Sequence, residues 1–173
     1  ANEGYVGLHH RLDTPASGLV LLTLDRNHNA PIANMFRDGD IERRYLVAVI
    51  GDTGPRGSWN NEIDDRPALT RWKQLSIKDG ISILDVTLET GRTHQIRRHA
   101  SDAGFPVVGD RRYGSAAGRV WPRLALHAHQ LWFTHPSTRE DLTVASPVPH
   151  DLLSLFRRAG WTVGQDKKSR DGA

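Results

Sequence analysis

Apolar residues along the chain fall mostly in short runs, many with the period of two at which side chains alternate between the faces of a β-strand. Glycine, proline and other turn-forming residues separate these runs. The first run, GLVLLTL, is almost purely apolar, so we expect it to be a buried strand. The pattern predicts strands at about 18–24, 44–50, 69–76, 81–90, 124–133 and 141–145.

Two other segments carry apolar residues at helical spacing. Residues 30–38 predict a helix that is capped by Asn29 and ended by Gly39. Residues 93–103 predict a second helix, with one apolar face and with Gly104 as its end. Because strands outnumber helices, we expect an α+β (mixed α/β) fold with a largely antiparallel or mixed sheet.

Two stretches show neither period. Residues 51–67 are rich in glycine, proline, asparagine and acids, which predicts a long exposed loop or hairpin excursion. Residues 164–173 (GQDKKSRDGA) are predicted to be a basic, disordered tail. Residues 1–163 are then expected to form a single domain of ordinary size.

Composition narrows the class of protein. The chain of 173 residues contains no cysteine, which excludes disulfides and thiolate metal sites. Its longest apolar run is far shorter than the roughly 20 residues that a membrane-spanning helix needs. We therefore expect a soluble, cytoplasmic protein that is not bound to a membrane.

Arginine is concentrated between residues 92 and 123, where it exceeds the acids Asp102 and Asp110. Guanidinium groups pair bidentately with phosphate oxygens, so this excess predicts a surface that contacts nucleic-acid phosphates. A solvated arginine face without a ligand is the alternative. The arginines concerned are Arg92, Arg97, Arg98, Arg111, Arg112, Arg119 and Arg123.

Three stretches combine ionisable residues with apolar neighbours: HRLD at 10–13, RRYLVAVIG at 43–51 and ETGRTHQIRRH at 89–99. Asp13 precedes Thr-Pro, so we expect it in a turn, where it could meet a ligand or simply form the turn. The third stretch opens a helix, whose free N–H groups favour an anion. Its side chains are either aimed into a cleft or carried on an ordinary charged surface helix.

The nine histidines raise the question of a metal site. Only His127 and His129 have a spacing that places them on one strand face, and no third ligand stands at a recognised spacing. We therefore predict no metal and interpret this pair as strand residues with satisfied hydrogen bonds. The sequence also lacks the motifs of serine hydrolases, nucleotide hydrolases and dinucleotide-binding enzymes.

Five motifs, in order, resemble those of the RluA-type RNA pseudouridine synthases. HRLDTPASGLVLL is similar to the family's HRLD-x-x-T-S-G-L-L-L motif, and LETGRTHQIRRH to its G-R-T-H-Q-I-R motif. FRDGDIERRYLVAVIG is similar to its tyrosine-bearing strand. GFPVVGDRRYG and LALHAHQLWFTHP are similar to its G-x-P-I-x-G-D-x-x-Y-G and L-H-A-x-x-L-x-F-x-H-P segments.

The resemblance implies a cofactor-free isomerase that detaches uracil from ribose in structured ribosomal or transfer RNA, turns it and rejoins it through carbon 5. It implies a catalytic domain with a long, mostly antiparallel sheet. The resemblance does not set the oligomeric state, for which we expect a monomer. By motif position, Asp13 is the nucleophile, Tyr45 stacks on or near the target base, and Arg97 pairs with Asp13. The attack requires an ionised carboxylate, a form that a neighbouring guanidinium favours.

The same resemblance implies a set of substrate-binding side chains, of which Arg11 helps to hold the nucleotide out of its helix. A non-catalytic RNA-binding module is the second hypothesis, and a metal-dependent phosphodiesterase is the third. The side chains predicted to bind substrate are His10, Arg11, Arg92, Thr93, His94, Gln95, Arg111 and Arg112.

The chain departs from the family pattern at two places. Ala16 replaces a threonine whose hydroxyl could brace the aspartate turn. Family members also begin with a strand region that contains an Asn-Lys-Pro-x-Gly motif, whereas ANEGYVGLHH here leads almost directly into HRLD. We expect either a short member or a processed product, in which a newly exposed sheet edge would invite pairing with another chain.

Overall fold

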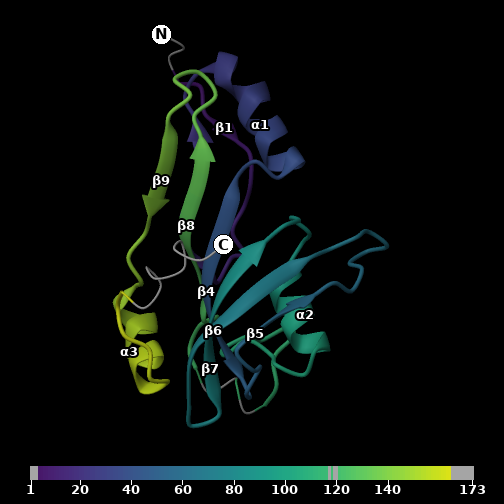
Figure 1. Cartoon of the computed structure of the whole chain (residues 1–173), viewed down its shortest axis with the longest axis vertical. Helices are drawn as coiled ribbons and strands as arrows, with labels where there is room; N and C mark the ends of the chain where they lie inside the picture. The colour runs from purple at the N-terminus through teal and green to yellow at the C-terminus, as the bar shows by residue number, and fades with distance from the viewer. Residues whose placement is uncertain (1–3, 117, 119–120, 165–173) are drawn as a thin grey trace.

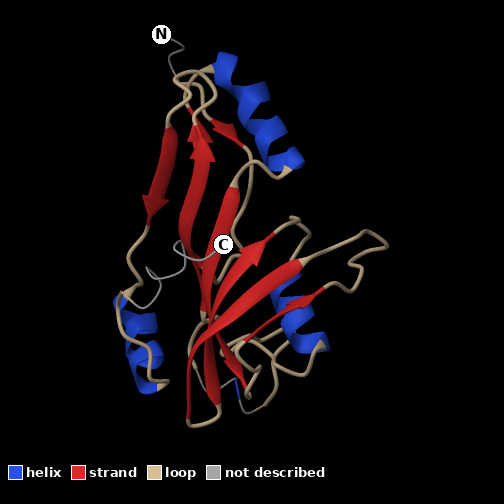
Figure 2. Ribbon diagram, viewed as in Figure 1, coloured by secondary structure: helices blue, strands red, loops and turns tan. Residues whose placement is uncertain are grey.

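A twisted seven-stranded sheet runs through the computed structural model, which describes residues 4–116, 118 and 121–164 (Figures 1 and 2). Its order is β2-β8-β4-β7-β6-β5, with β9 also paired to β8. All of its pairings are antiparallel except β2 with β8. The predicted α+β class and mostly antiparallel sheet are therefore confirmed. The strands are β2 (Ser17–Gly18), β4 (Glu42–Ile50), β5 (Arg56–Trp59), β6 (Thr70–Lys78), β7 (Ile81–Leu88), β8 (Leu126–Thr134) and β9 (Asp141–Ala145).

The central strand β4 is covered on both faces, which explains the continuous apolar run at 45–50. Tyr45 and Val47 point into a core that α2 (Gln95–Asp102) closes with Ile96. Leu46 points into a second core on the opposite face. Helix α2 lies within the predicted span 93–103. It packs against the face of the sheet that carries Tyr45.

The second core is closed by α3 (His150–Arg158), a helix that the apolar pattern did not lead us to predict. Its buried residues Leu152, Leu155 and Phe156 fall at helical spacing. The chain then turns at Gly160, whose φ of 83° favours glycine. The helix was missed because its apolar positions are few and follow closely on the last strand.

Helix α1 (Asn29–Asp38) packs Met35 and Phe36 on a third, smaller core at the far end of β4 and β8 (Figure 1). The prediction that Asn29 caps this helix is wrong, because Asn29 is already helical. Asp25 instead caps the preceding 3-10 turn by accepting the Asn27 N–H at 2.9 Å. The predicted end is confirmed, since Gly39 takes a φ of 87°.

The apolar run 18–24 does not form a buried strand, which corrects the sequence prediction. It is split into β2 and β3 (Leu22–Thr23), and β3 pairs only with β1 (Gly7–Leu8) in a separate two-stranded sheet. Gly18 has a φ of 121° and packs directly against the backbone of Ala128 in β8. After this contact the chain leaves β8. Beyond this point Leu24 is 72% exposed.

Residues 51–67 form the predicted hairpin excursion, since β5 pairs antiparallel with β6. The segment is not wholly exposed, however, because Ile63 is buried and Trp59 packs on Trp72. Of the predicted tail 164–173, all but Gly164 lies outside the described residues. In the part of the chain that the structure describes, no helix is long and apolar enough to span a bilayer.

Candidate active site

Arg97 of α2 stands between two carboxylates that come from distant parts of the chain. Its Nη1 donates to Asp13 Oδ2 at 3.1 Å. Its Nε and Nη2 donate to the two carboxylate oxygens of Asp110 at 2.7 and 2.9 Å. The structure therefore brings Asp13 and Arg97 together, and it adds an acid that the sequence did not lead us to place in the site.

Asp13, Arg97 and Asp110 form a triad of side chains, and Asp110 is its most deeply buried member. It is 1% exposed, and its Oδ1 also accepts the backbone N–H groups of Arg112 and Tyr113 at 2.9 and 3.0 Å. Burial raises the pKa of the Asp110 carboxyl, but the hydrogen bonds from Arg97 and these two N–H groups outweigh it, so the pKa lies below its ordinary value. Asp110 thus stays ionised and fixes the Arg97 guanidinium.

Asp13 lies in the turn that the sequence predicted, with its carbonyl accepting the Ala16 N–H at 2.7 Å. Its carboxylate is only partly covered, since 20% of the side chain is exposed. Arg123 holds the far side of this turn by donating to Pro15 O at 3.4 Å and to Ser17 Oγ at 2.8 Å. The turn therefore presents a fixed but accessible carboxylate.

A pocket of about 700 Å³ opens in front of Asp13. Tyr45 and most of the predicted substrate-binding residues line it, whereas Arg111 and Arg112 do not. Those two arginines lie instead on the loop that follows Asp110. Among the residues that line the pocket are His10, Arg11, Asp13, Arg37, Arg43, Tyr45, Arg92, Thr93, His94 and Gln95.

Two aromatic side chains of the site are held in their neutral forms. Burial raises the pKa of the Tyr45 hydroxyl, and Asp13 raises it further against the opposing effect of Arg43. His10 accepts the Leu21 N–H through Nε2 at 2.8 Å. Burial, helped by the Arg43 charge, lowers the pKa of His10 to about 4, so the ring is uncharged at neutral pH. Neither group therefore adds a charge to the pocket at neutral pH.

Gln95 has a structural task at the start of α2. Its Oε1 accepts from Thr90 Oγ1 at 2.8 Å and from the Arg92 N–H at 2.9 Å. Its Nε2 donates to Leu69 O and Thr70 Oγ1, both at 3.0 Å. With all four hydrogen-bonding positions used, the Gln95 side chain shapes the 89–95 loop and occupies the Arg92 N–H.

His94 precedes α2 in the left-handed region, with a φ of 55°. Its Nδ1 lies 3.0 Å from the Tyr113 hydroxyl, and its Nε2 lies 3.8 Å from Asp13 Oδ1. Tyr113 also lies beneath the Arg97 guanidinium, whose carbon is 5.1 Å from the ring centroid. No sequence pattern led us to select Tyr113, although it stands three residues after Asp110 in the GDRRYG motif.

Several arginines of the predicted phosphate-contacting surface are already engaged with acids. Arg97 is buried in the triad, Arg98 pairs with Asp64 at 2.8 Å, and Arg123 pairs with Asp151 at 3.0 Å. Arg119 lies outside the described residues. Of the remaining described arginines of this set, Arg92 lines the pocket, and Arg111 and Arg112 lie on the loop after Asp110.

His127 and His129 have the hydrogen-bonding and ionic neighbours expected of buried strand residues. His127 Nδ1 lies 2.9 Å from Ser17 Oγ, and its Nε2 lies 3.2 Å from Ser146 O. His129 lies 3.7 Å from Asp85. Within the described residues, no group of three or more His, Asp or Glu side chains is placed to hold an ion.

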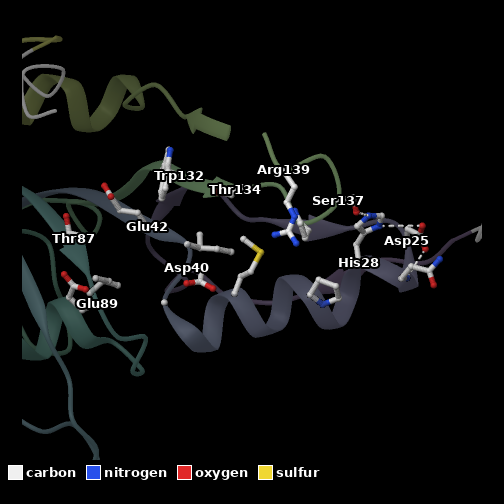
Figure 3. A pocket seen from close by; sticks show the side chains of 17 residues that line it. Asp25, His28, Asp40, Glu42, Thr87, Glu89, Trp132, Thr134, Ser137 and Arg139 are labelled. Atoms are coloured by element: carbon white, nitrogen blue, oxygen red, sulfur yellow. Dashed lines mark hydrogen bonds and ion pairs between the residues drawn. The ribbon is translucent and has the colours of Figure 1, made fainter. Parts of the chain in front are cut away.

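A larger hollow, of about 1030 Å³, lies along α1 and the 134–139 loop (Figure 3). Asp25, Asp40, Glu42 and Glu89 line it, against a single arginine, Arg139. It includes neither Asp13 nor the other members of the triad. Such an acidic lining repels phosphate, so the smaller pocket is the better candidate for a nucleic-acid site.

Comparison with known proteins agrees with the five motifs. The sequence profile of the family described as RNA pseudouridylate synthase matches residues 1–102. Ribosomal large subunit pseudouridine synthase D of Nitrosomonas europaea is 33% identical over 173 residues, which cover 87% of this chain and 50% of that protein. The protein of the same name from Xanthomonas campestris is 32% identical, over 87% of this chain and 54% of that protein. The chain thus spans about half the length of these curated relatives.

The fold agrees as well. The solved structure of human RNA Pseudouridylate Synthase Domain Containing 1 matches with a TM-score of 0.72 and 28% sequence identity, over 85% of this chain and 71% of that chain. The profile match alone covers more than half of the sequence. The chain therefore belongs to the RNA pseudouridylate synthase family, and its motifs place it among the RluA-type members.

Proposed function

We propose that this chain isomerises uridine to pseudouridine in structured RNA, without a cofactor or metal. The observation that carries the proposal is the triad, in which a buried Asp110 fixes Arg97 and Arg97 holds Asp13 at the mouth of the pocket. The names of the two bacterial relatives favour ribosomal RNA as the substrate over transfer RNA. Action on that RNA also favours a cytoplasmic location.

The reaction breaks the N1–C1′ bond, forms a C5–C1′ bond, and exchanges the hydrogen on C5 for one on N1. Asp13 is the nucleophile, attacking either C1′ of the sugar or C6 of the base. Arg97 holds the carboxylate in place through the hydrogen bond from its Nη1 to Asp13 Oδ2 at 3.1 Å. Asp110 does not touch the substrate in this scheme and acts by positioning Arg97.

The target uridine must leave its stem before Asp13 can reach it, at a cost of about a few kcal/mol. Tyr45, on the wall of the pocket, offers an aromatic surface for the extruded base. Arg11 and Arg92 line the same pocket and supply positive charge for the backbone. Stacking and phosphate contacts together offset the cost of unstacking.

The test is tritium release from unmodified large-subunit ribosomal RNA that carries tritium on uridine C5. We expect the chain to release tritium into water and to leave pseudouridine among the digested nucleosides, with the same rate in the presence of a chelator. Salt-sensitive RNA binding without release would contradict the proposal and favour the binding-module hypothesis. Loss of activity on chelation would favour a metal-dependent enzyme.

Arg111 and Arg112 are predicted to bind RNA backbone outside the pocket, since both are exposed. Replacing both with glutamine should weaken RNA binding and reduce the slope of log K against log salt by about 0.7 for each phosphate that is no longer neutralised. The rate of tritium release at saturating RNA should stay unchanged. An unchanged salt slope would show that neither side chain contacts phosphate.

A further inference from the structure

Arg43 on β4 is a buried cation that the triad does not use. The residue is 7% exposed, and its Nε has no hydrogen-bond partner. Its Nη2 donates to Leu88 O at 3.3 Å. In the part of the chain that the structure describes, no carboxylate oxygen lies within 4.0 Å of its guanidinium. A guanidinium remains charged in proteins, so Arg43 is a desolvated charge without a counter-ion.

The other buried arginines of the site region are paired, which makes Arg43 the exception among them. Arg44, the next residue on β4, binds both carboxylate oxygens of Asp85 on the opposite face of the sheet. Arg97 binds Asp110 in the same way. Leaving a buried charge without a partner is strongly unfavourable, so an unpaired one is retained where a ligand supplies the missing charge.

The position of Arg43 shows where such a ligand would sit. Arg43 and Tyr45 lie two residues apart on β4, and both line the pocket in front of Asp13. A Cβ atom added to Gly91 would lie 2.8 Å from Arg43 Nη1, so the glycine leaves the guanidinium its space at the pocket rim. The anion site is therefore adjacent to Tyr45 and to the 89–95 loop.

The surroundings favour an anion over a neutral group. The negative charge of Glu89 acts on Arg43 from a distance, but Glu89 is already paired with Arg71, whose Nε lies 3.0 Å from Glu89 Oε1. Because the Leu21 N–H occupies Nε2 of His10, the neutral ring of this pocket-lining residue carries its proton on Nδ1. A base carbonyl would leave the charge of Arg43 uncompensated, whereas a phosphate oxygen would neutralise it.

We propose that Arg43 binds a phosphate oxygen of the RNA backbone adjoining the uridine whose base lies against Tyr45. The proposal rests on the proposed function for the identity of the ligand, since free phosphate would satisfy the same charge. Arg43 then anchors the extruded nucleotide and sets its sugar at the distance from Asp13 that attack requires. It is a substrate-binding residue that the family motifs, as read from the sequence, did not assign.

The test compares three variants in which methionine, of similar length and without charge, replaces an arginine. Arg43→Met removes the unpaired cation, and Arg44→Met removes a paired buried one. Arg157→Met removes an exposed arginine of α3, a helix that packs on the core of the opposite face of the sheet. We expect Arg43→Met alone to lower affinity for a uridine-containing RNA about 10-fold, with an unchanged or higher melting temperature. Arg44→Met should lower the melting temperature instead.

The source of the phosphate is tested with RNA that carries a neutral methylphosphonate at each phosphate flanking the target uridine in turn. One of these should weaken binding to the unaltered chain about 10-fold and have no further effect on Arg43→Met. Equal losses in both proteins, or a lowered melting temperature with unchanged affinity, would overturn the proposal. Inorganic phosphate that competes as well as the RNA would assign Arg43 to free phosphate and also overturn it.

Gly91→Ala provides a variant that keeps every charge. Its added methyl group displaces Arg43 Nη1, and the backbone at Gly91 does not need a positive φ. It should reproduce the selective loss of RNA affinity and of the methylphosphonate effect. Because all of these readouts are binding, an Arg43-dependent phosphate contact without tritium release would sustain the inference while refuting the proposed activity.

Discussion

Asp13→Asn is expected to abolish tritium release while leaving the protein folded and able to bind RNA. The amide has the size of the carboxylate but no negative charge with which to attack, so the rate should fall by about 10³-fold or more. Arg97 keeps both of its bonds to Asp110, and the ion pair between Arg97 and Asp13 is partly exposed. The free energy of unfolding should therefore change by no more than about 1 kcal/mol.

Two measurements accompany that rate. A urea melt establishes that the variant is folded, and a filter-binding titration establishes that its affinity for RNA is preserved. Asp25→Asn is a matched control, because Asp25 lies in the acidic hollow along α1 and should leave the rate unchanged. Equal release by Asp13→Asn and the unaltered chain would remove Asp13 as the nucleophile.

The sequence predicted the central strands well because their pattern has one dominant cause. β4, β7 and β8 are buried through most of their length, so most of their residues are apolar and turn residues mark their ends. The run 18–24 has the same composition, yet it leaves the sheet after Gly18 and exposes Leu24. Composition records that a segment is apolar, but it does not record what covers it.

The site was predicted in part for a related reason. Motif positions selected Asp13 and Arg97, and in the structure Arg97 Nη1 lies 3.1 Å from Asp13 Oδ2. Asp110 was not predicted as a site residue, because the sequence around an acid next to arginines is the same whether the acid lies on the surface or is buried in an ion pair. Arg43 was not predicted as a site residue. What distinguishes it is a buried Nε without a hydrogen-bond partner among the described residues, and no sequence pattern shows that.

The triad and Arg43 divide the charges of the pocket by function. Asp110 keeps both of its hydrogen bonds to Arg97 in the proposed reaction, so Asp13 leaves Arg97 and attacks without stranding a buried cation. Arg43 has no such carboxylate partner among the described residues, and in our proposal a phosphate of the RNA supplies the missing negative charge. In this scheme Arg97 is preorganised for the reaction. Arg43 favours binding of the substrate and lowers the stability of the protein without substrate.

Asp110→Asn should be the most destabilising of the single substitutions considered, because it leaves Arg97 buried with only Asp13 as a partner. Removing one member of a buried ion pair lowers the free energy of unfolding by about 3–5 kcal/mol. The asparagine Oδ1 can still accept the N–H groups of Arg112 and Tyr113, so the loop itself should persist. Urea unfolding at pH 7 measures the loss, and a change below about 1 kcal/mol would contradict the anchoring role.

The dependence of stability on pH gives the same prediction a second measurement. The pKa of Asp110 in the folded protein is lower than its ordinary value of 3.8, so its ionised form contributes stability above that value. This contribution is lost as the pH falls through the lower, folded pKa. The unaltered chain should therefore lose stability steeply on acidification below about pH 4, and Asp110→Asn should show a shallower slope there. Parallel slopes in the two proteins would mean that Asp110 is not held ionised by Arg97.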